Sequence, residues 1–306
     1  MERTRPLRSD DSMLLLGRLD GRLQSSPCVD IFLARSRLEG AVELAGLAGV
    51  PIKLSDLHDW IAGRSPPPRA TEGLNDPMSV AAIFHVALSR DEDTNDPVHR
   101  ATLKVLRVIL DDRVEVQTYG SDDLAHLGPL WRQIRAAANT PFTSGDLLEI
   151  SSRVFELGEL TEQSARMGSD VVSIDGRTWE LLPRQRDRNW LIATAVPMML
   201  QQAGFTTRVI PSLVLLPKFL PPSPAELAGL LSERLAAAAR AGLRDLDVIE
   251  RAAARLASDR PVTKRSKSPL LRRLQIAYPG LQASAVSRLL GVTPQGARKL
   301  LAASPR

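Results

Sequence analysis

Residues 284–303 constrain the fold of this chain more than any other stretch, because their apolar side chains recur at the spacing of two short helices. Ser284 is suited to cap the start of the first helix, and Gly291 is suited to end it, since glycine readily adopts the left-handed conformation at a helix C-terminus. The apolar positions of this first helix share one face: Val286, Leu289 and Leu290.

A second helix is predicted directly after this glycine. Thr293 is a favourable N-cap, and Pro294 suits the first helical position. The apolar positions again share one face: Ala297, Leu300 and Leu301. A preceding helix that ends at Pro279-Gly280 is predicted from a further set, Leu270, Leu271, Leu274 and Ala277. Two short helices joined by a tight turn with glycine form a helix-turn-helix, here within a three-helix unit.

The outward face of the second helix has the chemistry of a DNA-reading surface. Gln295, Arg298 and Lys299 lie opposite the apolar stripe when the helix is laid out at about 100° per residue. Glutamine can pair with adenine in the major groove, and arginine or lysine can contact guanine or phosphate. The sequence therefore predicts a recognition helix, with Thr293 holding its start and contacting a phosphate.

Charge supports this interpretation independently of the helical pattern. Residues 261–306 contain no Asp or Glu and nine basic residues, which leaves a net charge of −4 on residues 1–260, since the whole chain carries +5. A basic terminal module on a mildly acidic body is typical of nucleic-acid binding. We expect six further cations of this region to contact the DNA backbone: Lys264, Arg265, Lys267, Arg272, Arg273 and Arg288. The alternative is a unit that only packs or dimerises, with solvated charges.

Helical spacing extends through most of the chain and predicts a mostly α fold, a multi-helical body with a C-terminal helix-turn-helix module. Further helices are predicted at 13–23, 29–48, 54–61, 78–88, 99–111, 121–128, 130–138, 144–167, 190–202, 224–239 and 244–256. The best strand candidate is the alternating segment Val114–Tyr119, whereas the apolar run Val209–Leu216 is too short to assign. The expected organisation is an N-terminal helical segment (1–62), a Pro-rich loop (63–77), a helical body (78–257), a basic linker (258–268) and the DNA-binding module (269–306).

Composition fits a bacterial cytoplasmic protein. The chain has 306 residues, of which 43% are hydrophobic and 4% aromatic, so helices packed through small and branched side chains can bury a large core. The single cysteine, Cys28, allows no disulfide within the chain. Charged residues interrupt the first positions after Met1, and no apolar stretch is long enough to span a bilayer, so neither a signal peptide nor a membrane partner is expected.

Local motifs give no indication of enzymatic chemistry. The four histidines occur singly, and none has the spacing of metal ligands: His58, His85, His99 and His126. The carboxylates of residues 91–96 lack the glycine and terminal glutamate of a calcium loop. No nucleophile elbow, phosphate loop or dinucleotide glycine pattern occurs. We therefore expect no catalytic residues, no metal and no cofactor.

Three stretches carry a resemblance to a known family: Gly17–Leu23 with Ser26-Pro27 and the following Leu54–Asp59; Arg188–Leu213; and Val292–Gln295. On these residues the chain resembles an alphaproteobacterial, often plasmid-borne family that joins a helical domain of unknown function to a C-terminal helix-turn-helix. This chain departs from the family at Ala45–Gly49, where members carry an acidic Trp-x-x-Gly-Glu segment. The resemblance implies a transcriptional regulator or a replicon-associated DNA-binding protein.

The helical body is also faintly similar to Fic-type adenylyl transferases. The segment before the expected Trp190 helix, Arg184–Asn189, lacks the histidine and glycines of their catalytic loop, which leaves no general base and no phosphate cradle. That similarity implies a catalytically dead scaffold. The alternatives to DNA binding are thus a degenerate Fic-like modifier or a protein-interaction component of a toxin-antitoxin or defence system.

The partner expected first is double-stranded DNA. A single module of this size usually binds weakly, so a homodimer that reads two half-sites is expected. For the helical body we expect one of two roles: dimerisation, or the sensing of an unknown protein or small-molecule effector.

Overall fold

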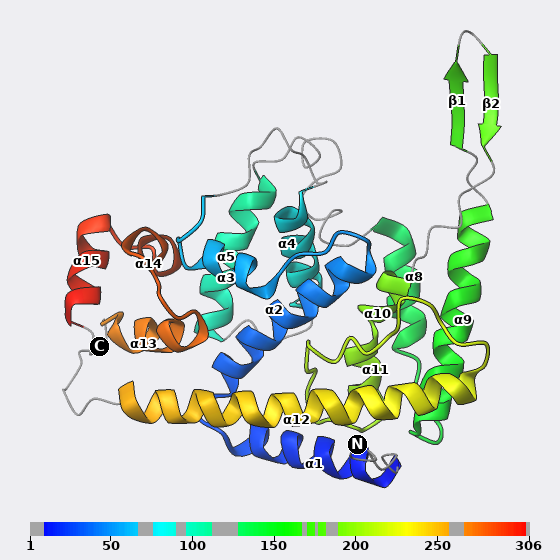
Figure 1. Ribbon diagram of the computed structural model, residues 1–306, viewed down its shortest axis with the longest axis horizontal. Coiled ribbons are helices and arrows are strands. Elements are labelled where there is room, and N and C mark those ends of the chain that lie inside the picture. The colour runs from blue at the N-terminus through cyan, green and yellow to red at the C-terminus, as the bar shows by residue number, and fades with distance from the viewer. Residues whose placement is uncertain are drawn as a thin grey trace, which may run out of the picture.

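The computed structural model describes residues 9–66, 76–89, 96–111, 128–166, 170–174, 177–181, 189–256 and 266–303. Helices dominate these residues, which confirms the predicted mostly α fold class (Figure 1). The helices are α1 (Ser9–Ser25), α2 (Val29–Leu47), α3 (Leu54–Ile61), α4 (Pro77–Leu88), α5 (Pro97–Asp111), α8 (Gly128–Ala138), α9 (Leu147–Arg166), α10 (Asn189–Ala193), α11 (Val196–Gln202), α12 (Pro224–Leu256), α13 (Ser268–Ala277), α14 (Ala283–Leu290) and α15 (Pro294–Ala303).

One antiparallel hairpin departs from the helical pattern. Strand β1 (Asp170–Ile174) pairs with β2 (Arg177–Leu181), with Asp170 opposite Leu181 and Ile174 opposite Arg177. The hairpin projects from the helical body near the end of α9 (Figure 1). It was not among the predicted elements, and the predicted strand Val114–Tyr119 lies outside the described residues.

The long helix α12 forms one edge of the molecule, and α1 lies along it (Figure 1). Arg22 on α1 forms ion pairs with Asp247 and Glu250 on α12, at 2.5 and 2.6 Å. The prediction of two helices, at 224–239 and 244–256, is wrong, because α12 continues through Gly242. A Cβ atom at Gly242 would lie only 2.9 Å from Cδ2 of Leu19 on α1, so the glycine marks a close helix contact rather than a helix end.

The central helix α2 packs against α3, α4, α5, α10, α12 and α13. The apolar run Val209–Leu216 crosses beside it as an irregular, mostly buried segment. Side chains satisfy part of its backbone: Ser36 Oγ accepts a 2.8 Å hydrogen bond from the Ser212 N–H, and Arg234 Nη1 donates to the carbonyls of Leu215 and Leu216. This bonding explains how an apolar run without regular structure is tolerated in the interior.

A break divides the helix predicted at 190–202 into α10 and α11. Pro197 cannot donate a backbone hydrogen bond, and the chain turns at Thr194 and Ala195 before α11 begins. The Thr194 hydroxyl donates to the Leu191 carbonyl at 2.5 Å and so satisfies one acceptor at the end of α10. A kink was predicted at this proline, and the structure shows two separate helices.

A single hydrophobic cluster runs from Leu16 in α1 to Ala297 in α15. Polar side chains are buried where α2, α4, α5 and α13 meet, and Arg37, His85, His99 and Tyr278 are each at most 1% exposed. The Tyr278 and Thr102 hydroxyls lie 2.7 Å apart in a hydrogen bond, and burial raises the pKa of Tyr278 to about 12. His85 and His99 are therefore core residues, which is one of the two placements, core or surface, predicted for each histidine. His126 lies outside the described residues.

Candidate nucleic-acid interface

Helix α14 begins and ends through different local signals. Its N-cap is Gln282, with extended backbone, so the prediction of Ser284 as the cap is wrong and Ser284 lies within the first turn. Its C-cap is Gly291 at φ 62°, the left-handed conformation predicted there. The Ser287 hydroxyl donates to the Val292 carbonyl at 2.6 Å and helps fix the turn of residues 291–293.

Helix α15 starts as predicted. The Gly296 N–H donates to Thr293 Oγ1 at 3.1 Å, which is the hydrogen bond of a threonine N-cap, and Pro294 is the first helical residue. Ala297 is fully buried, and Leu300 and Leu301 are partly buried against the core. The apolar stripe therefore seats the helix on α14, against which it packs.

The opposite face of α15 is open to solvent. Gln295, Arg298 and Lys299 are all exposed, and none has a hydrogen bond or ion pair to another described residue. Figure 1 places α15 at one end of the molecule, on the far side of α14 from the body. Three of the predicted DNA-reading side chains are thus available on one helix, which the cap at Thr293 fixes at its start.

The C-terminal helices are joined to the rest of the fold by specific contacts. The Gln282 N–H donates to the Ala62 carbonyl at 2.8 Å, and Arg35 Nη2 donates to the Ile276 carbonyl at 2.7 Å. Helix α13 packs against α2, α5 and α12, and α14 packs against α5. The exposed face of α15 is therefore held in a fixed orientation relative to the body.

Arg273 forms its ion pair within the protein, although its side chain is 36% exposed. Its guanidinium donates to both carboxylate oxygens of Asp30, in the first turn of α2, and to the carbonyl of Pro27. The hydrogen bond to Asp30 raises the pKa of Arg273. Because these bonds use Nε and Nη2, we remove Arg273 from the set of expected phosphate contacts.

Arg288 also has a neighbour within the protein. Its guanidinium carbon lies 5.8 Å from the centroid of the Trp60 ring on α3, a cation–π geometry, and burial lowers the pKa of Arg288. This places the guanidinium against α3, so Arg288 too is a weaker candidate for a phosphate contact than the cations of α15.

The other predicted backbone contacts lie at the start of the module. Lys267 is the N-cap residue of α13 and is exposed, and Arg272 is partly exposed. Neither has an ion pair to another described residue. Lys264 and Arg265 lie outside the described residues, as do most of the predicted basic linker and residues 67–75 of the predicted Pro-rich loop.

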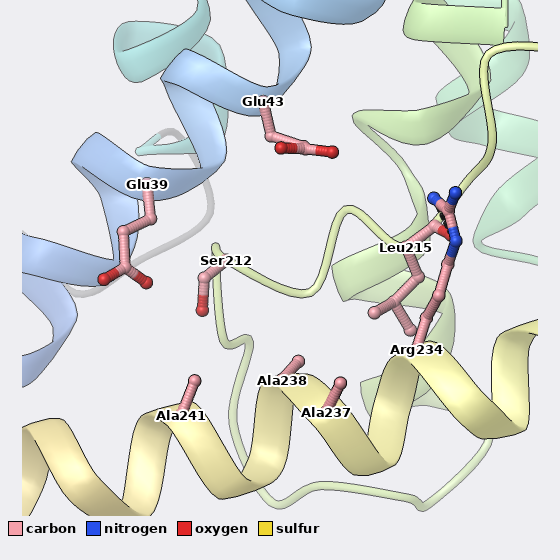
Figure 2. Close-up of a pocket in the computed structure, with 8 residues that line it drawn as sticks. All are labelled: Glu39, Glu43, Ser212, Leu215, Arg234, Ala237, Ala238 and Ala241. Carbon is pink, nitrogen blue, oxygen red and sulfur yellow. Dashed lines mark hydrogen bonds between the residues drawn. The ribbon is translucent and has the colours of Figure 1, made fainter. Parts of the chain in front are cut away.

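A pocket of about 480 Å³ lies between α2 and α12, away from these cations. Figure 2 shows Glu39 and Glu43 extending from α2 above three alanines of α12, with Arg234 at the other end. Desolvation and the nearby Asp245 raise the pKa of Glu39 to about 7. The two carboxylates would complement a cationic group, whereas Arg234 is turned to the carbonyls of residues 215 and 216.

Within the described ranges, no three His, Cys, Asp or Glu side chains gather as metal ligands would. No described helix has both the length and the apolar character needed to cross a membrane. Comparison of the chain with models of protein families, with curated proteins and with solved structures finds no match. The resemblance carried by Gly17–Leu23, Arg188–Leu213 and Val292–Gln295 therefore stays a prediction.

Proposed function

We propose that this protein binds double-stranded DNA through a helix-turn-helix formed by α13, α14 and α15, and that it acts as a transcriptional regulator or a replicon-associated factor. The observation that carries the proposal is the two-sided character of α15. One side is buried through Ala297, and the other exposes Gln295, Arg298 and Lys299. A helix with its apolar face occupied and a polar, cationic face free is what insertion into a major groove requires.

The dimensions and chemistry of α15 agree with that role. Its ten residues make a helix about 15 Å long, and an α-helix with its side chains is about 10–12 Å across, which a major groove about 12 Å wide admits. Gln295 lies in this first turn and has both a donor and an acceptor for adenine. Arg298 and Lys299 follow about one turn later and reach guanine or the flanking phosphates.

We further propose that a homodimer is the DNA-binding form. One module offers few base contacts, and two modules related by a twofold axis would read half-sites about 34 Å apart, which is one turn of B-DNA. Light scattering of the protein with and without duplex tests this, since a strict monomer in both samples would exclude it.

The test of DNA binding is fluorescence anisotropy with a labelled random-sequence duplex, followed by selection of the sequences bound most tightly. On the selected duplex the double variant Arg298→Ala and Lys299→Ala should bind about fivefold to a hundredfold more weakly, because one good base contact provides about 1–3 kcal/mol of discrimination. The matched control is Arg18→Ala and Arg251→Ala, which removes the same charge from exposed positions on α1 and α12. Equal affinity of the α15 variant and the control variant would refute the assignment.

A further inference from the structure

We propose that α5 forms a second DNA-contacting surface, in which Arg100, Lys104 and Arg107 hold the phosphate backbone beside the groove read by α15. The inference rests on the proposed function and adds to it a surface outside the C-terminal helices. We refer to these three side chains as the α5 cationic face.

The α5 cationic face follows from helical spacing. Residues 100, 104 and 107 lie at i, i+4 and i+7, so their side chains share one side of α5, and all three are exposed. The other side is buried through Val98, Ala101, Val105 and Leu106. The helix has no acidic residue before its last position, Asp111, so Arg100, Lys104 and Arg107 are its only exposed charges before that point, beside the exposed Val108.

Contacts with α14 place the α5 cationic face next to the proposed reading helix. Helix α14 packs against both α5 and α15, so it lies between them (Figure 1). The ammonium nitrogen of Lys104 lies 3.4 Å from the position that a Cβ atom of Gly291 would take. Gly291 begins the turn that leads to Thr293 and the start of α15. Lys104 thus lies beside the turn that leads into α15.

The charges of this face are not used within the described part of the protein. Elsewhere, Arg22 pairs with Asp247, Arg35 with Asp245, and Arg273 with Asp30. Arg100, Lys104 and Arg107 have no ion pair of this kind to any described residue. Helix α3, which meets α14 where Arg288 lies over the Trp60 ring, carries Asp56 and Asp59, and Asp59 is paired with Arg64 rather than with the α5 cationic face.

An unpaired row of like charges is slightly destabilising, because like charges at i and i+4 on a helix repel each other. A polyanion that lies along the row removes this repulsion and releases its own condensed counterions. Duplex DNA carries a dense row of phosphates on both sides of the groove that α15 is proposed to read. Duplex DNA is therefore the partner that best fits the α5 cationic face.

The experiment measures the salt dependence of duplex binding by the full chain. Affinity for a random-sequence duplex is measured between about 50 and 200 mM NaCl, and the slope of log Kobs against log[NaCl] falls by about 0.9 for each phosphate that the protein no longer neutralises. The triple variant Arg100→Gln, Lys104→Gln and Arg107→Gln should lower the magnitude of the slope by about 2–3. Glutamine keeps helix propensity close to that of arginine and lysine, so α5 should still form, which circular dichroism checks.

A matched control removes the same charge elsewhere: Arg18→Gln, Lys218→Gln and Arg251→Gln, all exposed and outside α5, α14 and α15. This control should leave the slope at the wild-type value. If the α5 variant also keeps the wild-type slope while Arg298→Ala with Lys299→Ala loses affinity, α5 does not contact DNA. This inference then fails, and the proposed function stands. If the wild-type protein binds no duplex, the proposed function and this inference fail together.

Discussion

Arg273 and Asp30, which lie 243 positions apart in the sequence, form a bidentate ion pair that fastens α13 to the first turn of α2. The same arginine also donates to the Pro27 carbonyl. A basic residue within a cationic C-terminal region thus serves the fold. Local charge density alone does not distinguish such a residue from one that contacts DNA.

Replacing Arg273 with alanine should therefore destabilise the protein without changing its salt-dependent DNA binding. Hydrogen bonds to charged groups contribute about 1.5–3 kcal/mol, and the variant leaves the mostly buried Asp30 carboxylate without this partner. Urea denaturation measures the loss, and anisotropy below the unfolding transition measures the slope. A double-mutant cycle with Asp30→Asn isolates the pair, and a change in slope as large as that of a phosphate contact would contradict the structural role.

Thr293→Ala should weaken both stability and duplex binding, because the Gly296 N–H loses its acceptor at the start of α15. Loss of a threonine N-cap typically costs about 1 kcal/mol. Thr293→Ser keeps the hydroxyl and should retain most of both properties. Urea denaturation and anisotropy on the three proteins give the comparison, and an alanine variant indistinguishable from wild type would show that the cap is unimportant.

Gln295→Ala should alter sequence preference while leaving the salt slope unchanged. The side chain is neutral, so it releases no counterion, but a glutamine that pairs with adenine contributes about 1–3 kcal/mol of discrimination at one base pair. Selection from a random duplex library with wild type and variant reveals the difference. Identical selected motifs would place Gln295 away from the bases.

Acid should destabilise the protein through His85 and His99. Burial, reinforced by the nearby Arg37, lowers the pKa of His99 to about 3 and that of His85 well below its ordinary value. Both side chains take up protons near pH 6.5 only in the unfolded chain, so the unfolding free energy falls as pH decreases below about 6.5, by up to about 1.4 kcal/mol per pH unit for each histidine. Urea midpoints between pH 7 and pH 5 measure this decline.

The variant His99→Leu tests which group is responsible. Neither ring nitrogen of His99 has a hydrogen-bond partner among the described residues, so an apolar replacement removes the titration without breaking a bond. The decline with acid should become about half as steep, given two equivalent histidines. An unchanged pH profile would assign the acid sensitivity to other groups.

The variant Glu39→Gln should be more stable than wild type at pH 7, and this advantage should be smaller at pH 5. Desolvation and the nearby Asp245 raise the pKa of Glu39 to about 7, so near pH 6 the folded protein binds a proton there that the unfolded chain has already lost. Wild-type stability from this residue therefore decreases as pH rises from about 4.5 to 7, which is opposite in sign to the histidine effect. Its carboxylate is open to solvent at the pocket, so only the direction is expected. Urea midpoints of wild type and of Glu39→Gln, each measured at pH 5 and pH 7, check this direction.

Local signals were sufficient to predict α15 from the sequence. Thr293, Pro294 and Gly291 act through backbone and cap preferences that hold over a few residues, and the structure confirms each of them. The buried position of Ala297 follows from helical spacing alone. Gln282 as the cap of α14 was missed because Ser284 is the stronger capping residue by type, whereas the hydrogen bond from the Gln282 N–H to Ala62 fixes the chain earlier.

Features that depend on distant contacts could not be predicted. Gly242 resembles a helix end in the sequence, and only the close approach of Leu19 shows that it lies at a tight contact inside a continuous α12. The spacing of Arg100, Lys104 and Arg107 was visible, but nothing in the sequence indicates that α5 lies beside α14.

The hairpin, in contrast, had a local sequence signal that was missed. The dipeptide Asp175-Gly176, which stands between the two strands in the sequence, is favoured in two-residue hairpin connections.

The hydrogen bond between the buried hydroxyls of Tyr278 and Thr102 joins the end of α13 to α5 in the body. Cutting the chain before α13 would leave Tyr278, Leu271 and Leu274 without the helices that cover them. Transferring α13, α14 and α15 to another protein would therefore require their supporting helices as well. In the proposed homodimer, the contacts of these helices with the body would fix the separation of the two α15 helices, so half-sites with altered spacing would bind more weakly.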